Sequence, residues 1–350
     1  MRPGRNSCNP RFPDRDDRYS RQVLFHGIGG EGQAKLSASK VAIVGCGATG
    51  SVLASLLGRS GVGTIRIIDR DYVETSNLQR QALFDEADAA QSMPKSIAAG
   101  RKLAAFNSEI VVEPIVADLT PENIHDLLFG AHLILDGTDN FETRYLMNDF
   151  AAENSIPWIY TAAVGSYIAA MNILPGKTAC LTCIFPGPPE GAIETCETSG
   201  VLNSAANLAS SIAATEAIKI LVGADDEVRR TLLSIDAWRN ERSEVSARNP
   251  RPACRTCGMR DFVHLRGADR ATITLCGRNS VQIHERRRPI NLDEMSRALI
   301  PLGTVRHNEF VLKFWKEPYE MTLFPDGRAI IKGTVDKAVA RSLYARYVGT

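Results

Sequence analysis

The run Val41-Ala42-Ile43-Val44-Gly45-Cys46-Gly47-Ala48-Thr49-Gly50 sets the architecture of this 350-residue chain. Four apolar residues, mostly β-branched, are typical of a parallel strand that is buried on both faces. The glycines then turn the chain into a helix that we predict over residues 51–59. A G-x-G-x-x-G motif in this context points backbone N–H groups and a helix N-terminus at a phosphate, and it is compatible with NAD, FAD and ATP alike.

Strands and helices continue to alternate through the first 165 residues. We predict further strands at residues 64–69, 110–116, 132–136 and 158–161, and helices that begin near residues 94, 121 and 141. Alternation of this kind predicts an α/β fold with a doubly wound, Rossmann-like, mostly parallel sheet. The later segments are a strand at 167–174, an apolar helix at 201–222 and a strand at 232–236.

Changes in sequence texture divide the chain into three parts. We predict a disordered arm at residues 1–16, the α/β domain at residues 17–262 and a small α+β domain at residues 263–350. The last part has predicted strands near 272–275, 281–283, 310–314, 319–324 and 329–332, and helices from 292 and over 335–347.

Charge and hydropathy argue against several classes of function. With 41 basic and 40 acidic side chains, the chain has no overall field that would recruit nucleic acid or an anionic membrane. The first 17 residues have no apolar run that could serve as a secretory signal. Because the apolar stretch at 201–222 contains Asn203, Glu216 and Lys219, we expect a buried core helix, no membrane span and a cytoplasmic protein.

Four of the eight cysteines form two Cys-x-x-Cys pairs, which are Cys180/Cys183 and Cys254/Cys257. Two such pairs can supply the four thiolates of a tetrahedral zinc site. A redox dithiol or a pair that has lost its metal is the alternative. Cys196 is a spare thiol that would suit transfer chemistry, with a small structural cysteine as the alternative. Cys46, inside the glycine turn, is interpreted as a packing residue.

Polar residues suited to a nucleotide follow the glycine turn. Asp69 ends the next predicted strand, 19 residues after Gly50, where a carboxylate can bind both ribose hydroxyls. A helix or turn cap is the alternative for Asp69. Asn77, Arg80 and Lys95 come next, and an amide and two cations can hold a triphosphate and stabilise a departing pyrophosphate. Solvated surface charges are the alternative for the two cations.

Asp139 and Asn140 follow the predicted strand at 132–136, at the carboxyl edge where doubly wound sheets bind ligands. A carboxylate there can hold the Mg²⁺ that accompanies ATP. Capping of the helix that begins near residue 141 is the alternative. The two roles are compatible if Asp139 binds the metal and its neighbour caps the helix.

Motifs spread over residues 17–260 occur in a fixed order. They are Arg18-Tyr19-Ser20-Arg21-Gln22, the glycine turn, residues 76–81, Pro94-Lys95, residues 136–144, the two cysteine pairs and residues 196–201. In this order they resemble the motifs of the ThiF/MoeB/HesA family, the bacterial relatives of ubiquitin-activating enzymes. So many ordered motifs make chance agreement a poor explanation.

The resemblance implies an adenylyltransferase that uses ATP and Mg²⁺ to activate the C-terminal glycine of a ubiquitin-like sulfur carrier protein, with release of pyrophosphate. A ThiS-like carrier of thiamine biosynthesis is favoured over a MoaD-like carrier of molybdopterin biosynthesis. The sulfur would come from a donor such as a cysteine desulfurase or a rhodanese.

The same resemblance implies roles for individual residues. Gly45, Gly47 and Gly50 resemble the nucleotide loop, Asp69 the ribose ligand, Asn77, Arg80 and Lys95 the phosphate contacts, and Asp139, beside Asn140, the Mg²⁺ ligand. Arg21 resembles the arginine that reaches the γ-phosphate region of the neighbouring subunit, which implies a homodimer. Cys196 matches the cysteine of a crossover loop that joins the carrier through sulfur in ThiF-like members.

Three other functions stay open at this point. Activation of a ubiquitin-like modifier for protein conjugation would need a thioester at Cys196. A non-catalytic scaffold that binds the carrier would tolerate loss of the phosphate ligands. An NAD-dependent oxidoreductase would not need Arg80, Lys95 or Asp139, so their joint presence argues against it. The C-terminal part is too short for a rhodanese, and its position alone suggests carrier docking or support of a dimer.

Overall fold

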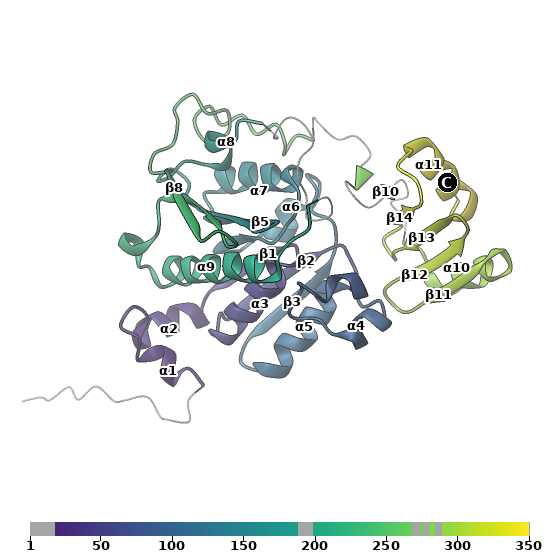
Figure 1. Ribbon diagram of the computed structural model, residues 1–350, viewed down its shortest axis with the longest axis horizontal. Helices are drawn as coiled ribbons and strands as arrows, with labels where there is room; N and C mark the ends of the chain where they lie inside the picture. The colour runs from purple at the N-terminus through teal and green to yellow at the C-terminus, as the bar shows by residue number, and fades with distance from the viewer. Residues whose placement is uncertain (1–17, 188–198, 268–273, 276–279, 284–288, 350) are drawn as a thin grey trace, which may run out of the picture.

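The computed structural model describes residues 18–187, 199–267, 274–275, 280–283 and 289–349 (Figure 1). The predicted arm at residues 1–16 lies outside this part of the chain, and so do Cys196 and Cys276.

An eight-stranded sheet forms the centre of the larger domain, in the order β3-β2-β1-β4-β5-β6-β7-β8. Its strands are β1 (Lys40–Val44), β2 (Thr64–Asp69), β3 (Val111–Val116), β4 (Leu133–Asp136), β5 (Trp158–Val164), β6 (Tyr167–Ile173), β7 (Thr231–Asp236) and β8 (Glu241–Ser246). The pairings among β1 to β5 are parallel, and β6, β7 and β8 add antiparallel strands at one edge. The doubly wound, mostly parallel fold is therefore confirmed.

β1 shows why this sheet is buried on both faces. Val41 and Ile43 belong to one buried apolar cluster, whereas Ala42 and Val44 belong to another. Because successive strand residues point to opposite faces, helices must cover the sheet on both sides. The first layer contains α2 (Gly29–Ser37), α3 (Gly50–Arg59), α5 (Lys95–Phe106) and α9 (Asn203–Val222), and the second contains α6 (Ile124–Leu128), α7 (Phe141–Asn154) and α8 (Leu181–Ile184). The short elements α1 (Ser20–Val23), η1 (Thr75–Asn77), α4 (Glu86–Ala90) and η2 (Asp225–Glu227) lie in the connections.

The apolar helix at 201–222 corresponds to α9. Within the described ranges it is the one helix long and apolar enough to cross a membrane, and half of its most apolar window is buried in the protein. Its small residues Ala209, Ala213 and Ala217 are fully buried, and the helix packs against α3 and β5. The helix therefore has the core position predicted from its polar residues.

β8 is a strand that the sequence pattern did not predict. Its residues Glu241–Ser246 are all exposed and mostly polar, so no apolar alternation marks them. The strand exists because it pairs along its whole length with β7.

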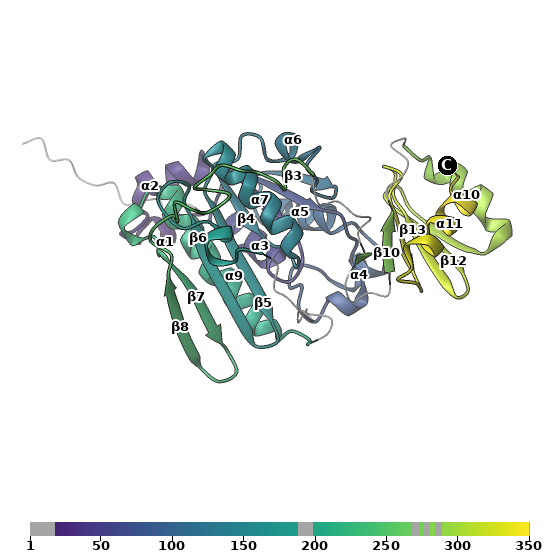
Figure 2. The same cartoon turned by 90° about the horizontal axis from the view of Figure 1, so that it is seen from above.

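The C-terminal domain contains a second, antiparallel sheet in the order β11-β12-β13-β14-β10-β9. Its strands are β9 (Thr274–Leu275), β10 (Ser280–Ile283), β11 (Thr304–His307), β12 (Leu312–Lys316), β13 (Tyr319–Leu323) and β14 (Ala329–Lys332), accompanied by α10 (Leu292–Leu299), η3 (Ile300–Leu302) and α11 (Lys337–Tyr347). The small α+β domain is confirmed, although β11 was missed. The boundary at residue 262 stays a prediction. Figure 2 shows this sheet beyond α4, at one end of the molecule.

Candidate active site

The glycine turn follows β1, and two of its glycines, Gly45 and Gly50, are packed too closely for a side chain. Gly45 has a φ of +85°, in the left-handed region that favours glycine. A Cβ on Gly50 would lie 1.9 Å from the carbonyl oxygen of Gly45, and a Cβ on Gly137 would lie 2.2 Å from the same oxygen. Gly137 follows β4, so the ends of two neighbouring strands meet in this turn. Gly47 differs, because in the described part of the chain the nearest atom to a Cβ placed there is 3.9 Å away.

Asp69 lies beside the glycine turn, at the end of β2. Its Oδ2 accepts a hydrogen bond from the backbone N–H of Cys46 at 2.5 Å, and its Oδ1 accepts one from Asp71 at 2.7 Å. The side chain is buried, and burial raises the pKa of its carboxyl group, with the nearby Lys95 opposing that rise. Two backbone bonds leave a carboxylate with further lone pairs for a ligand.

Lys95 is the first residue of α5 and is only 3% exposed. Its Nζ lies 3.3 Å from Oδ2 of Asp71. The surface-charge interpretation of Lys95 is therefore wrong, because β2 and the start of α5 bury this cation next to two carboxylates. Asp71 was missed, although its position two residues after Asp69 at a strand end was a usable signal.

Asn77 and Arg80 belong to the polar segment that runs from η1. Asn77 is buried, and its Oδ1 accepts a hydrogen bond from the backbone N–H of Glu74 at 3.1 Å. Arg80 is partly exposed, with Nη1 donating to the carbonyl oxygen of Ser76 at 2.8 Å. Gln81 was missed as a site residue: its Oε1 is buried and has no hydrogen-bond partner among the residues that the structure describes, and its Nε2 lies 4.0 Å from the position of a Cβ on Gly47. A buried acceptor without a partner beside a glycine turn suits a polar ligand.

Of the two residues Asp139 and Asn140, the second performs the capping role. Asn140 caps α7, with its side chain accepting a hydrogen bond from the backbone N–H of Thr143 at 2.9 Å. Asp139 is exposed just before that helix, so its carboxylate is available to solvent and ligands. The segment that carries it is held by Arg144, whose Nε donates to Asp136 at 2.8 Å and whose Nη2 donates to the carbonyl oxygen of Thr138 at 2.7 Å.

Arg21 does not join this cluster within one chain. It is exposed on α1, where its neighbour Gln22 donates to the carbonyl oxygen of Ser60 at 2.9 Å. Ser60 follows the last turn of α3, whereas the glycine turn lies before the first. A helix of this length separates the two ends by about 15 Å. The structure therefore places Arg21 at the opposite end of α3 from the glycine turn.

The two cysteine pairs meet in one cluster. The four sulfur atoms of Cys180, Cys183, Cys254 and Cys257 all lie within 4.8 Å of one another. The Sγ–Sγ distances are 3.8 Å for Cys180 to Cys183, 3.6 Å for Cys180 to Cys254 and 3.4 Å for Cys183 to Cys257. A tetrahedron with Zn–S bonds of about 2.3 Å has sulfur atoms about 3.8 Å apart, so these thiols fit zinc.

Helix α7 holds both cysteine pairs through buried hydrogen bonds. Asn148 accepts from the backbone N–H of Leu181, next to the first pair. Asp149 accepts from the hydroxyl of Thr256, inside the second pair, and from the backbone N–H of His264. Such outer contacts orient the ligands of structural metal sites.

Cys46 is fully buried in the core cluster of the glycine-turn face. Burial raises the pKa of its thiol well above the ordinary value, with the carboxylate of Asp69 adding to the rise. A thiol held in its neutral form is a poor nucleophile, so the packing interpretation suits this residue.

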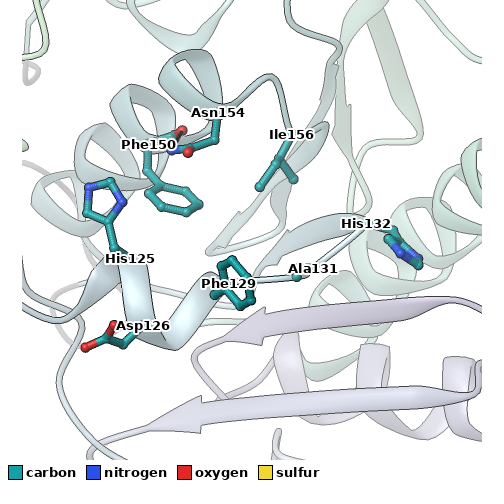
Figure 3. Close-up of a pocket in the computed structure, with 9 residues that line it drawn as sticks. His125, Asp126, Phe129, Ala131, His132, Phe150, Asn154 and Ile156 are labelled. Atoms are coloured by element: carbon teal, nitrogen blue, oxygen red, sulfur yellow. Dashed lines mark hydrogen bonds between the residues drawn. The ribbon is translucent and has the colours of Figure 1, made fainter.

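A shallow pocket of about 410 Å³ lies at the other end of the sheet (Figure 3). Figure 3 shows His125 and Asp126 on α6, Phe150 and Asn154 on α7, and Ile156 in the segment before β5. These segments adjoin the amino ends of β4 and β5, whereas the glycine turn and Asp69 lie at carboxyl ends. Ligands of doubly wound sheets bind at the carboxyl ends, so this pocket lies at the opposite edge from the expected nucleotide site.

Several known proteins are similar to this chain in sequence and in fold. The ThiF family model matches residues 19–256. A Bacillus subtilis (strain 168) protein named sulfur carrier protein ThiS adenylyltransferase is 43% identical over 336 residues, covering 95% of this chain and 99% of that protein. A Haloferax volcanii protein named SAMP-activating enzyme E1 is 35% identical over 243 residues, covering 69% and 88%. The solved structure of E. coli MccB with ATP is 27% identical, with a TM-score of 0.60 over 69% of this chain and 75% of that one. Because the match to the Bacillus protein covers 95% of this chain, it extends into the C-terminal domain.

Proposed function

The chain belongs to the ThiF family, and from that membership we propose that it adenylates the C-terminal glycine of a ubiquitin-like sulfur carrier protein at the expense of ATP. The relative that matches almost the full length is named for ThiS, which favours a ThiS-type carrier over a MoaD-type one. The product is then ready for thiocarboxylate formation with sulfur from a separate donor, such as a cysteine desulfurase or a rhodanese.

One observation carries the proposal: the ends of β1, β2 and β4 bring the glycine turn, Asp69 and buried Lys95 together, with Gly137 closing the turn. The turn offers backbone N–H groups to phosphate, and the lysine offers positive charge beside it. A dinucleotide of the NAD type has a smaller phosphate charge and does not require a buried cation here.

The reaction joins a carboxylate oxygen of the carrier's terminal glycine to the α-phosphorus of ATP, and the bond from that phosphorus to the bridging oxygen breaks. Pyrophosphate leaves with the electron pair of that bond. Two anions must approach each other, so catalysis consists mainly of positioning and charge neutralisation. We assign the ribose to Asp69 and the phosphates to Asn77, Arg80 and Lys95.

Asp139 would hold Mg²⁺, which supplies charge neutralisation on the phosphates when it is bound. The exposed carboxylate at the carboxyl edge of β4 supports this assignment, because Asn140 already performs the capping role. The four-cysteine cluster is assigned to a structural zinc ion, supported by sulfur spacing close to that of a tetrahedral thiolate site. All of its ligands are protein thiols, so zinc there would brace the fold.

We assign Arg21 to the active site of a partner subunit in a homodimer. Its position at the far end of α3 supports this, because the side chain cannot reach the glycine turn of its own chain. Residues 17–262 are proposed as the adenylation domain, and the cytoplasm as its compartment. Cys196 lies outside the described residues, and a covalent bond between its sulfur and the carrier stays part of the proposal.

Trapping of the activated carboxylate tests this function. The purified protein is incubated with ATP, Mg²⁺, hydroxylamine and candidate carriers that end in Gly-Gly, and the carrier mass is measured. A terminal hydroxamate that forms only with ATP and with one class of carrier is the expected result. If the purified protein binds ATP but leaves every candidate carrier unmodified, adenylation is contradicted. When a sulfur donor and possible target proteins are also supplied, a carrier thiocarboxylate indicates sulfur transfer, whereas a carrier–protein conjugate indicates activation of a modifier.

A further inference from the structure

The C-terminal domain contacts the segment that joins Asp69 to Asn77. β2 ends at the first of these residues and η1 ends at the second, so residues 70–76 connect two of the proposed nucleotide ligands. Figures 1 and 2 both place the C-terminal sheet on the side of the larger domain where α4 lies. The contacts across this boundary are specific and largely buried.

One face of the C-terminal sheet is turned towards this segment. In β14, Ile331 belongs to the core of the C-terminal domain, whereas Ile330 clusters with Tyr72 of the larger domain. Because side chains alternate along a strand, Lys332 shares the face of Ile330. The sheet therefore covers its own helices with one face and the connection after β2 with the other.

Tyr72 is the apolar anchor of this contact. It is 5% exposed and packs in a buried cluster with Val311, Phe324 and Ile330. The Nζ of Lys313 lies 4.0 Å from the centre of its ring. An aromatic side chain buried in this way fixes the path of the chain between Asp69 and η1.

Lys332 holds the turn that carries Asn77. Its Nζ donates to Oε1 of Glu74 at 2.6 Å, and the hydroxyl of Tyr72 donates to the same oxygen at 3.3 Å. The backbone N–H of Asn77 donates to the backbone carbonyl oxygen of Glu74 at 2.8 Å, and the Asn77 side chain accepts a hydrogen bond from the backbone N–H of Glu74 at 3.1 Å. The lysine thus fixes the side chain of Glu74, the residue that precedes η1 and makes two hydrogen bonds to Asn77.

Arg328 holds the other end of the segment. Its side chain is fully buried, and its Nη1 donates to the backbone carbonyl oxygen of Arg70 at 3.1 Å. Arg70 donates through Nη1 to both carboxylate oxygens of Asp118 at 3.2 Å, and Gln282 of the C-terminal domain donates to the same carboxylate at 3.0 Å. Arg70 directly follows Asp69, so this contact fixes the chain next to the proposed ribose ligand.

We propose that Lys332 and Arg328 are positioning residues for the nucleotide site, which makes the C-terminal domain part of the machinery that binds ATP. They act through the segment between Asp69 and Asn77 and need not touch the nucleotide. The inference rests on the proposed function for its substrate, and its readout is ATP affinity rather than carrier turnover.

The test compares ATP binding by calorimetry in folded full-length variants. Lys332→Met is expected to weaken ATP binding about five-fold, because it removes a half-buried ion pair. The ATP affinity of Lys332→Arg should stay within about two-fold of the wild-type affinity. Lys316→Met removes an exposed lysine at the end of β12 and is the matched control, with affinity unchanged. Glu74→Gln should weaken ATP binding by a similar factor. The variant that carries both Lys332→Met and Glu74→Gln should lose less affinity than the two single losses combined.

A Lys332→Met protein that binds ATP as tightly as the wild type would overturn the proposal, even if its thermal midpoint fell. If Lys332→Met does not fold, Glu74→Gln replaces it in the test, and a Glu74→Gln protein with unchanged ATP affinity overturns the proposal as well. Failure of the proposed function is separate: the wild type would then bind ATP but activate no carrier, and the comparison of ATP affinities would still decide the positioning role.

Discussion

The Nζ of Lys95 lies 3.3 Å from Oδ2 of Asp71, and Lys95 is buried beside the glycine turn. A buried lysine without a counterion is costly, so Asp71 stabilises the cation while no phosphate is bound. A triphosphate would offer Lys95 a further anionic partner in the same place. The pair therefore links the stability of the free protein to its affinity for nucleotide.

Asp71→Asn should lower the free energy of unfolding by about 1 to 3 kcal/mol, because Lys95 stays buried with one carboxylate fewer. Asp71→Glu, which keeps the charge, is the control and should lose less. Saturating ATP should raise the thermal midpoint of Asp71→Asn by more than that of the wild type. Equal ATP-dependent shifts in both proteins would show that the Lys95 cation does not interact with the phosphates.

Two glycines of the turn should respond differently to the same substitution. Gly50→Ala places a Cβ 1.9 Å from a backbone oxygen and should destabilise the protein by about 3 kcal/mol or more. Gly47→Ala has at least 3.9 Å of room and should fold normally, yet weaken ATP binding about ten-fold by obstructing the phosphate approach. Chemical unfolding and calorimetry measure the two effects. Normal ATP affinity in Gly47→Ala would show that the nucleotide does not bind at this turn.

Glu113 gives a prediction for pH. Burial works to raise the pKa of its carboxyl group, but hydrogen bonds from Lys40 and Arg66 outweigh it and hold the pKa below its usual value. A lowered pKa in the folded state adds stability above the unfolded value of about 4.5, and protonation removes it at lower pH. Glu113→Gln should cost about 0.5 to 1 kcal/mol at pH 7, after allowance for solvent screening. The difference from wild type should shrink as the pH falls below about 4. A pH-independent difference, measured by urea unfolding, would contradict this assignment.

The four-cysteine cluster should bind one zinc ion per chain. Cys254→Ser should lose the metal and lower the thermal midpoint, because zinc stabilises the folded arrangement of the thiolates. Cys46→Ala removes a buried cysteine of the core and should keep its zinc, which makes it the matched control. Elemental analysis of the purified proteins checks both. Full zinc content in Cys254→Ser, or none in the wild type, would refute the site.

Subunit mixing tests the position of Arg21. Arg21→Ala and Asp139→Ala should each be inactive as homodimers, but a mixed dimer would contain one site with both groups intact. Random assortment of equal amounts then predicts about a quarter of wild-type activity. Mixing that restores nothing, with dimer exchange verified, would place Arg21 outside the partner's site.

Local chemistry made the first half of the fold predictable. Apolar strands such as residues 41–44 and the glycines after them define the parallel sheet and its ligand-binding edge, and the two Cys-x-x-Cys pairs define the metal cluster. β8 could not be predicted, because its exposed polar residues form a strand only through pairing with β7. The contact between Lys332 and Glu74 was equally hidden, since it joins residues 258 positions apart through tertiary packing.

Pyrophosphate exchange into ATP is a direct test of carrier adenylation by this protein. Purified protein is given Mg²⁺, ATP, labelled pyrophosphate and each candidate carrier ending in Gly-Gly, with Asp139→Ala in parallel. We expect exchange that requires one class of carrier, with ThiS-type carriers preferred, and that falls at least 100-fold in Asp139→Ala, which corresponds to about 3 kcal/mol of transition-state stabilisation. No exchange with any carrier, from folded protein that binds ATP, would contradict adenylation and leave a carrier-binding scaffold as the function.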